Sequence, residues 1–268
     1  MSSNQQTDVD DAAVAARAIV WNDVLESNLI AQLAADKQYS SDSEDSTLTW
    51  YKKYTDTLGS VGWRINNAVF TEVNYDRTEG TIHDTVLEQL ANDPTVSKAL
   101  YASVSRALLA FARTGSGSDA EKVFDSASIA SSSEFASFQL AVASVNADGD
   151  LNLTLLAWFY SSNQKIGSTL WFSWKNASLN LKTSTLTMTL NVDLYDQVRF
   201  SIHDKLDSAN KLELLVPLFE SLKVGVSIQT QKITTSMCTQ FVVSVQNDKR
   251  DVMGRHDCAF FLGSFRQW

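Results

Sequence analysis

The sequence predicts an α+β protein in which N-terminal helices are followed by an antiparallel, aromatic-rich β-meander, a C-terminal helix and short strands. In most segments before residue 128, apolar residues recur every three or four positions, as in amphipathic helices. From Phe135 to Asn191 they recur at every second position, as in strands that bury one face. Helices grouped before strands are typical of α+β folds rather than α/β folds.

The first 46 residues are predicted to form an acidic helical arm followed by a linker. Residues 1–47 carry nine acids and two bases, a net charge of −7 against −9 for the whole chain. Residues 8–38 are expected to form a helix with one apolar stripe: Val14, Ala18, Trp21, Leu25, Leu29 and Leu33. Residues 40–46 have no apolar side chain and are interpreted as a solvated linker. Residues 47–268 are predicted to form one α+β domain, with a C-terminal extension from about residue 225.

Local signals place the elements that precede the meander. Helices are expected at residues 47–61, at 82–92 behind a Thr81 cap, from Pro94 onward, and at 119–128. Residues 63–74 are β-branched and aromatic, which favours a strand.

The meander is expected to contain strands running up to residue 145, from residue 151 to 160, and at 169–174, 178–182 and 185–192. The Asp148-Gly149 pair between the first two of these is a strong hairpin signal. A helix is predicted between residues 194 and 222, interrupted at Pro217, with short strands at 224–229 and 240–245.

Composition excludes several classes of protein. A chain that is 44% hydrophobic, with only two prolines, is expected to fold around a core. It has no Lys/Arg stripe for phosphate groups, so we expect no nucleic-acid partner. Without a leader-like N-terminus or an apolar run of about 20 residues, the protein is expected to be soluble and cytoplasmic, with export by a specialised route as the alternative. Cys238 and Cys258 are therefore expected to be thiols.

We find no catalytic, metal-binding or cofactor-binding signature. The motifs of nucleotide sites, nucleophile elbows and zinc sites are absent, and we expect no cofactor. His83 and His203 are interpreted as surface residues, and the Arg255-His-Asp-Cys258 run lacks the spacing of a catalytic dyad. Four acids that could line a cleft leave an unrecognised hydrolase as a hypothesis: Asp76, Glu79, Asp84 and Glu88.

The aromatic residues of the predicted sheet are its most unusual feature. Residues 158–160 and 171–174 are expected to lie on neighbouring strands and to face both sides of the sheet. An aromatic core is one interpretation and an exposed recognition face is the other. Under the second interpretation the binding residues are Trp158, Tyr160, Trp171 and Trp174, together with Trp21 of the helical arm.

Three functions follow from these observations. The first is a non-enzymatic binding or self-associating protein, a homo-oligomer formed through the N-terminal helix, with the aromatic sheet as its recognition surface. The second is a membrane-active, pore-forming toxin-like protein, because residues 178–191 alternate as an inserted amphipathic hairpin would. The third is the hydrolase. We expect that the protein is not an enzyme.

One segment resembles a known group of proteins. Trp50-Tyr-Lys-Lys-Tyr-Thr-Asp-Thr-Leu58, followed by Gly62-Trp63 and the aromatic 156–160 segment, is similar to an uncharacterised group of bacterial and fungal proteins with the pattern WYxxYTDxL…GW. The resemblance covers about residues 47–220. It implies no activity, because none is known for the group, and no functional residue is carried over.

Overall fold

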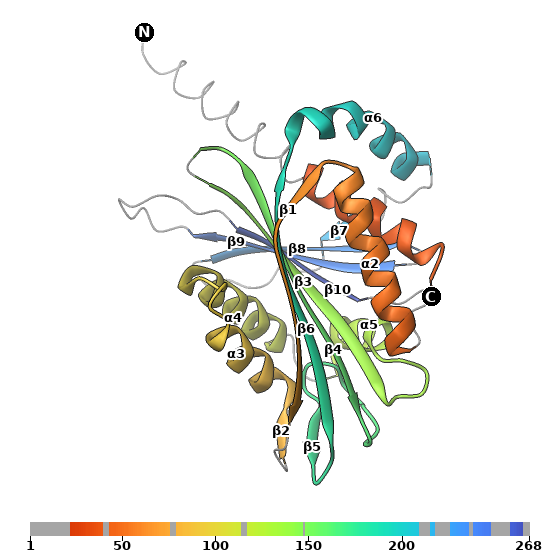
Figure 1. The fold of residues 1–268 in the computed structure, drawn as a ribbon, viewed down its shortest axis with the longest axis vertical. Helices are drawn as coiled ribbons and strands as arrows, with labels where there is room; N and C mark the ends of the chain where they lie inside the picture. Colours follow the sequence, from red (N-terminus) through yellow and green to blue (C-terminus); the bar gives the residue numbers. More distant parts are fainter. Residues whose placement is uncertain are drawn as a thin grey trace.

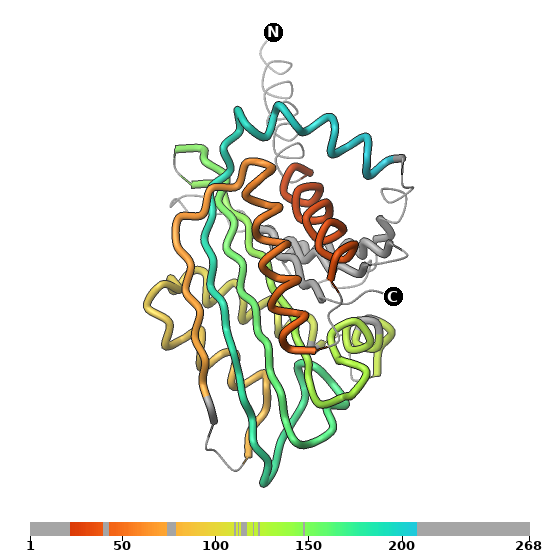
Figure 2. The backbone as a smooth tube through the Cα atoms, turned by 45° about the vertical axis from the view of Figure 1, so that its right-hand side comes forward, coloured from red at the N-terminus to blue at the C-terminus, as the bar shows by residue number. Residues whose placement is uncertain are grey.

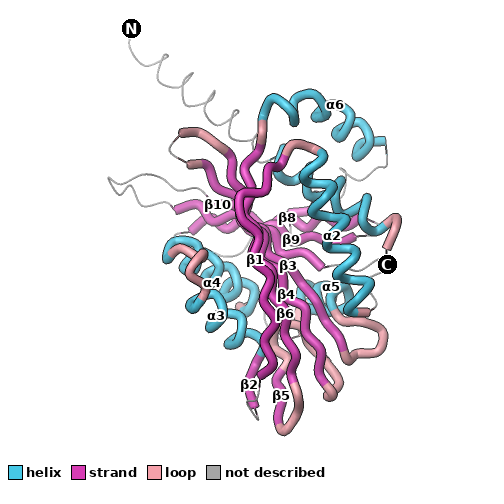
Figure 3. The backbone as a smooth tube through the Cα atoms, in the orientation of Figure 1, coloured by secondary structure: helices cyan, strands magenta, loops and turns pink. Residues whose placement is uncertain are grey.

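A computed structural model describes residues 22–39, 43–75, 79–113, 117–146 and 148–208, together with the strands at 215–217, 226–235, 238–247 and 258–264. The fold is α+β, as predicted. Eight antiparallel strands form one sheet in the order β1-β6-β4-β3-β10-β9-β8-β7, with helices on both sides (Figures 1 and 3).

The four strands that begin this order are β1 (Trp63–Tyr75), β6 (Leu179–Leu190), β4 (Leu151–Ser162) and β3 (Phe135–Val145). The other four are β10 (Cys258–Ser264), β9 (Cys238–Asn247), β8 (Val226–Thr235) and β7 (Leu215–Pro217). A separate two-stranded sheet pairs β2 (Glu79–Thr81) with β5 (Ser173–Lys175).

The helices form two groups on the two faces of the sheet. Face A packs against the N-terminal helix (described from residue 22 to 36), α2 (Glu44–Ser60) and α6 (Val192–Ser208). Face B packs against α3 (Ile82–Asn92), α4 (Lys98–Ala112) and α5 (Asp119–Ser128).

Strand β4 contributes to both cores. Its odd-numbered residues from Leu151 to Phe159 are buried on face A, while Leu156, Trp158 and Tyr160 are buried on face B. The period of two along a strand sends neighbours to opposite faces. Both faces of the central strands therefore need a helical cover, which explains why the helices lie on both sides.

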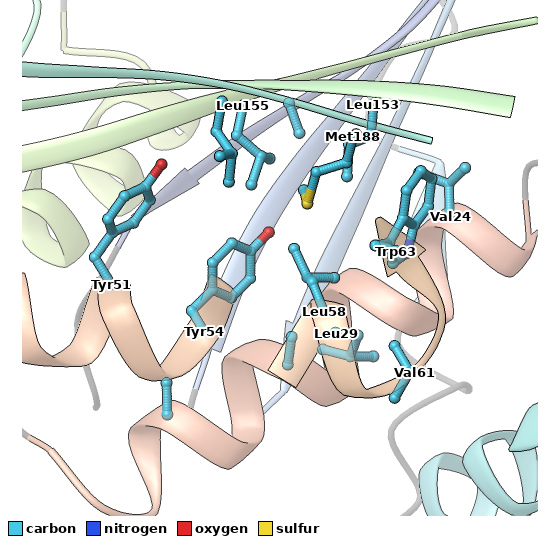
Figure 4. Close-up of a cluster of buried hydrophobic side chains, with 14 of the residues drawn as sticks. Val24, Leu29, Tyr51, Tyr54, Leu58, Val61, Trp63, Leu153, Leu155 and Met188 are labelled. Carbon is cyan, nitrogen blue, oxygen red and sulfur yellow. The ribbon is translucent and has the colours of Figure 1, made fainter. Parts of the chain in front are cut away.

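The N-terminal helix packs beside α2, and both cross face A (Figure 2). Val24, Leu29, Tyr54 and Leu58 point from the two helices toward Met188 and its neighbours on the sheet (Figure 4). For its described residues, the expected arm docks on its own domain. Much of the predicted apolar stripe, Trp21 included, lies outside the described residues.

Helix α2 begins in the segment that we interpreted as linker. The Ser43 side chain accepts a hydrogen bond from the Ser46 backbone, and the Ser46 side chain accepts one from the Ser43 backbone. Glu44 and Asp45 in the first turn favour the helix N-terminus. Because this cap starts the helix at Glu44, the linker prediction is wrong for residues 43–46.

Helix α3 spans the predicted residues behind its Thr81 cap, but α4 begins later than predicted. The Asp93 carboxylate accepts hydrogen bonds from the backbone and the hydroxyl of Thr95, 2.8 and 2.6 Å away. This local turn holds Pro94 outside the helix, and Ser97 caps α4 instead.

The strand predicted at residues 169–174 is largely absent. Only Ser173–Lys175 is extended there, and it pairs with β2 rather than with β4. The two strands expected at 178–182 and 185–192 are one continuous strand, β6, which pairs with β4 over its whole length. The two aromatic segments therefore do not lie on neighbouring strands.

The chain beyond residue 208 continues the large sheet. The helix predicted to reach residue 222 ends at Ser208, and Pro217 ends strand β7 instead. The short strands predicted near 224 and 240 are the longer β8 and β9. An unexpected strand, β10, pairs with β3 on one side and β9 on the other.

Backbone register predicts the state of the two cysteines. Cys258 lies opposite Val245 of β9, whereas Cys238 begins that strand and pairs with Thr235. At about 3.4 Å per residue the two cysteine backbones are roughly 24 Å apart, beyond the roughly 7 Å that a disulfide spans. Alkylation without reductant, followed by mass spectrometry, should find two modified cysteines. A Cys238–Cys258 disulfide in folded protein would contradict this register.

The position of Gly80 gives a second prediction, about stability. A Cβ atom at this position would lie 2.6 Å from the indole of Trp174. Trp174 is 2% exposed, so its ring has little room to move. Gly80→Ala should therefore lower the free energy of unfolding by about 1–3 kcal/mol, the usual cost of overpacking. Gly59→Ala is the control, since a Cβ there meets nothing within 4 Å. Thermal melts should separate the two variants, and equal melting temperatures would contradict the prediction.

Candidate functional site

Three of the five predicted binding residues are buried in the core. Trp158, Tyr160 and Trp174 are 2%, 1% and 2% exposed beneath the face B helices. Trp171 is half-buried in the loop before β5, where its ring lies 4.9 Å from that of His83. Trp21 lies outside the described residues. Among the predicted binding residues that the structure describes, only Trp171 is partly open to a partner.

Ring contacts and a hydrogen bond hold the buried aromatics. Trp158 stacks on Phe138 with ring centroids 5.0 Å apart. The Tyr160 hydroxyl donates to the Thr169 carbonyl over 2.6 Å, and burial raises the pKa of this tyrosine well above its usual value. Both side chains therefore have structural partners inside the chain.

The N-terminal helix is joined to the domain by apolar contacts, through Val24 and Leu29 among others, and also by polar contacts. Its inner face buries five polar residues: Asp23, Ser27, Asn28, Gln32 and Asp36. Three aromatic side chains of α2 and β1 donate hydrogen bonds into it: Trp50 to Asp36 (2.6 Å), Trp63 to Ser27 (2.9 Å) and Tyr54 to Asn28. The hydropathy pattern did not predict this buried polar face, because polar side chains are normally assigned to the solvent-exposed side of a helix. The sequence signal for this face was the pair of hydrogen-bond donors in the WYxxY segment, the Trp50 indole and the Tyr54 phenol.

Helix α6 adds charged contacts to the same helix. Arg199 donates two hydrogen bonds to the Asp23 carboxylate, over 2.8 and 2.7 Å. The Tyr195 hydroxyl donates to the Asp23 backbone carbonyl, 3.1 Å away. The imidazole Nδ1 of His203 lies 2.8 Å from the Glu26 carboxylate, and this contact raises the pKa of His203. The N-terminal helix is thus held between α2 and α6.

The His203–Glu26 contact predicts a pH effect on stability. Because the pKa of His203 is raised on folding, the contact stabilises the fold fully below the unfolded pKa of about 6.5. This stabilisation is lost as the pH rises through the folded pKa. His203→Gln should therefore melt at a lower temperature than the parent at pH 5.5 and at a similar temperature at pH 8.5. The difference should be small, because this pair is exposed to solvent.

Two variants control the measurement. Glu26→Gln should have the same pH-dependent effect, and the double variant should lose no more than either single variant. Melting curves that keep the parent's pH dependence in both single variants would contradict a role for this pair.

A groove of about 260 Å³ lies on face B beside the connection between α3 and α4. Thr185 of β6 donates to Asp93 over 3.0 Å and holds this connection against the sheet. Trp158 and Thr183 are among the lining residues, and Asp93 is the only acid or base among them. The one acid of the groove is thus engaged with the Thr185 hydroxyl, and its lining includes no His, Cys, Lys or Arg.

The acids that suggested a hydrolase do not converge on this groove. Glu79 and Asp84 are exposed, and Asp76 lies outside the described residues. Glu88 is half-buried on α3 and does not line the groove. Among the residues that the structure describes, no three His, Cys, Asp or Glu side chains are grouped as a metal site.

Two acids of α5 that we did not single out are more buried. Asp125 accepts a hydrogen bond from the Thr169 backbone over 2.7 Å, and burial raises its pKa. Glu121 is 7% exposed and contacts Gly117 and Ser168. Their partners are backbone and hydroxyl groups, so these acids anchor the 163–172 loop to α5.

The most extended chemical feature is the difference between the two faces of β1, β6 and β4. Leu153, Leu155, Leu186 and Met188 are buried on face A of the central strands. At the same level, face B carries polar residues that are exposed or half-buried: Arg64, Asn67, Asn152, Thr154, Thr187 and Thr189. Within the described part of the chain, no helix has the length and apolar character needed to cross a membrane.

Comparisons with known proteins identify no family. No family model matches the sequence, and no curated protein matches it. One solved structure, titled delta-endotoxin, is similar over 63% of this chain and 81% of its own, with 14% identity and a TM-score of 0.29. A likeness this weak says nothing about the fold or activity of the present chain. The resemblance of the Trp50–Leu58 segment to uncharacterised proteins stays an expectation.

Proposed function

We propose that this protein acts on lipid bilayers and that β1, β6 and β4 form the unit that enters them. The two-faced character of these strands carries the proposal; on β4 it extends to Thr154, beyond which Leu156, Trp158 and Tyr160 make face B apolar. A sheet in a bilayer presents apolar side chains to lipid and polar side chains to water on its other face. Faces A and B differ in this way over the stretch from Ile65 to Ala68 and at the same level of the neighbouring strands.

Strand length is compatible with insertion. A tilted spanning strand needs about 9–11 residues. Every face A position of β4 from Leu151 to Phe159 is apolar, and the whole strand spans Leu151–Ser162. On β6 the apolar positions run from Leu190 to Leu186, and Lys182 follows beyond Ser184. A lysine at the end of an apolar stretch can extend its ammonium group to the water interface.

The cover of face A is suited to release. Asp23, Asn28 and Asp36 can exchange their contacts with the domain for water, because a protein hydrogen bond contributes only about 1 kcal/mol net. Removing the N-terminal helix and α2 would uncover the apolar residues of face A and those of the two helices, such as Leu29, Trp50 and Leu58, and a bilayer would shield both sets again. The free-energy cost of moving these two helices away is thus offset at a membrane and not in water.

The first hypothesis from the sequence has less support. Its recognition residues Trp158, Tyr160 and Trp174 are enclosed in the core, and the described part of the N-terminal helix is engaged with its own domain. The hydrolase hypothesis gains no converging acid or base from the described residues.

A matched pair of neighbours on β1 tests the proposal. Phe70 is 53% exposed on face A, and Thr71 is exposed on face B, so both should accept lysine without unfolding the protein. A lysine facing lipid costs about 2–4 kcal/mol at the bilayer midplane and less toward either interface. Phe70→Lys should therefore lower the rate of dye release from vesicles several-fold, while Thr71→Lys should stay close to the parent.

The vesicles should include neutral and anionic compositions, and circular dichroism should confirm that both variants remain folded. Planar-bilayer recordings would add a second readout, because a lysine on the water-facing side should shift ion selectivity toward anions. No release by the parent at any composition, or equal losses in both variants, would overturn the proposal.

A further inference from the structure

Strand β1 forms an edge of the sheet and is its longest strand. Among the described strands it pairs with β6 alone, so alternate backbone N–H and C=O groups along its outer side have no strand partner there. Proteins usually shorten or charge such edges, because an open edge is a template for another strand. The middle of β1 instead exposes Ile65 (49%), Ala68 and Phe70 (53%), with charges only at Arg64 and Glu72.

The exposed apolar residues of β1 are arranged symmetrically. Ile65, Ala68 and Phe70 lie opposite Met188, Leu186 and Ser184, which are evenly spaced along face A of β6. The bulge at Asn66 creates this spacing. Ile65 and Ala68 are three positions apart, so in a regular strand they would point to opposite faces; the bulge lets both point to face A.

We infer that β1 pairs antiparallel with β1 of a second copy of this chain, about a twofold axis at Ala68. That register places Ile65 opposite Phe70 of the second copy, and Phe70 opposite its Ile65. A β-branched residue and an aromatic residue form one of the favourable cross-strand pairs. The two partly exposed side chains then cover each other on both sides of the axis.

The other positions of β1 also fit this register. On face B, Asn67 lies opposite Val69 of the second copy, and Arg64 lies opposite its Thr71. No like charges face each other directly, whereas such opposition would disfavour the pair. A twofold pairing closes on itself, because the same strand provides both halves of the contact. The inference depends only on β1 and holds whether or not the protein acts on bilayers.

Cysteine cross-linking in lipid-free solution tests the register. In Ala68→Cys, the twofold axis brings the two Cβ atoms to about 4.5–5.5 Å, from which a small shift allows a disulfide. In Thr71→Cys, the matched control, each cysteine lies opposite Arg64 of the other copy and several residues from its equivalent. Both positions are exposed, so neither change should disturb the fold.

Mild oxidation should give at least tenfold more 68–68 dimer than 71–71 dimer. Mass spectrometry should map the linked peptides, so that bonds to Cys238 or Cys258 are not counted. A mixture of Ile65→Cys and Phe70→Cys chains should form the mixed dimer in preference to either self-dimer. Equal yields at residues 68 and 71, or a parent that sediments as a monomer up to millimolar concentration, would overturn the inference. Vesicle release plays no part in this readout, so the two proposals can fail separately.

Discussion

Strand β4 imposes the constraint on which the rest of the fold depends, because it buries large apolar side chains on both faces. Leu153 and Leu155 need cover on face A, and Trp158 and Tyr160 need cover on face B. No single layer of helices can supply both. The N-terminal helix, α2 and α6 therefore pack on one side, and α3, α4 and α5 pack on the other.

The two covers differ in their chemistry. The face B helices bring mainly apolar and aromatic side chains, such as Phe111 and Phe124, whose rings meet edge to face at 5.3 Å. On face A, the N-terminal helix is held by aromatic donors and by the Asp23–Arg199 ion pair. Polar contacts have a good alternative in water, whereas buried apolar contacts have none. The face A cover has the larger polar share of the two, beside buried apolar residues such as Trp50 and Leu58.

Strand β1 contacts the face A helices and also forms an edge of the sheet. Trp63 anchors one end of β1 beneath the N-terminal helix, while Ile65 and Phe70 remain partly exposed on the same face. The proposed release of the face A helices and the proposed pairing of two copies would thus both involve β1. The bulge at Asn66 matters to both, because it sets which side chains of β1 point to face A.

The sequence alone determined the fold class and those elements whose signals are local. Thr81 caps α3 as predicted, and α5 spans the predicted residues behind a Ser118 cap, because a cap needs only its own first turn. Where local and tertiary interactions compete, the sequence was not enough: Asp93 keeps Pro94 out of α4, and residues 169–172 pack as a loop against α3 and α5. Burial of Trp158 and Asn28, and the open edge at Ile65 and Phe70, depend on which segments meet in space. The type of a side chain does not show which segments contact each other, because the same aromatic or amide group can face water or bind a partner in the core.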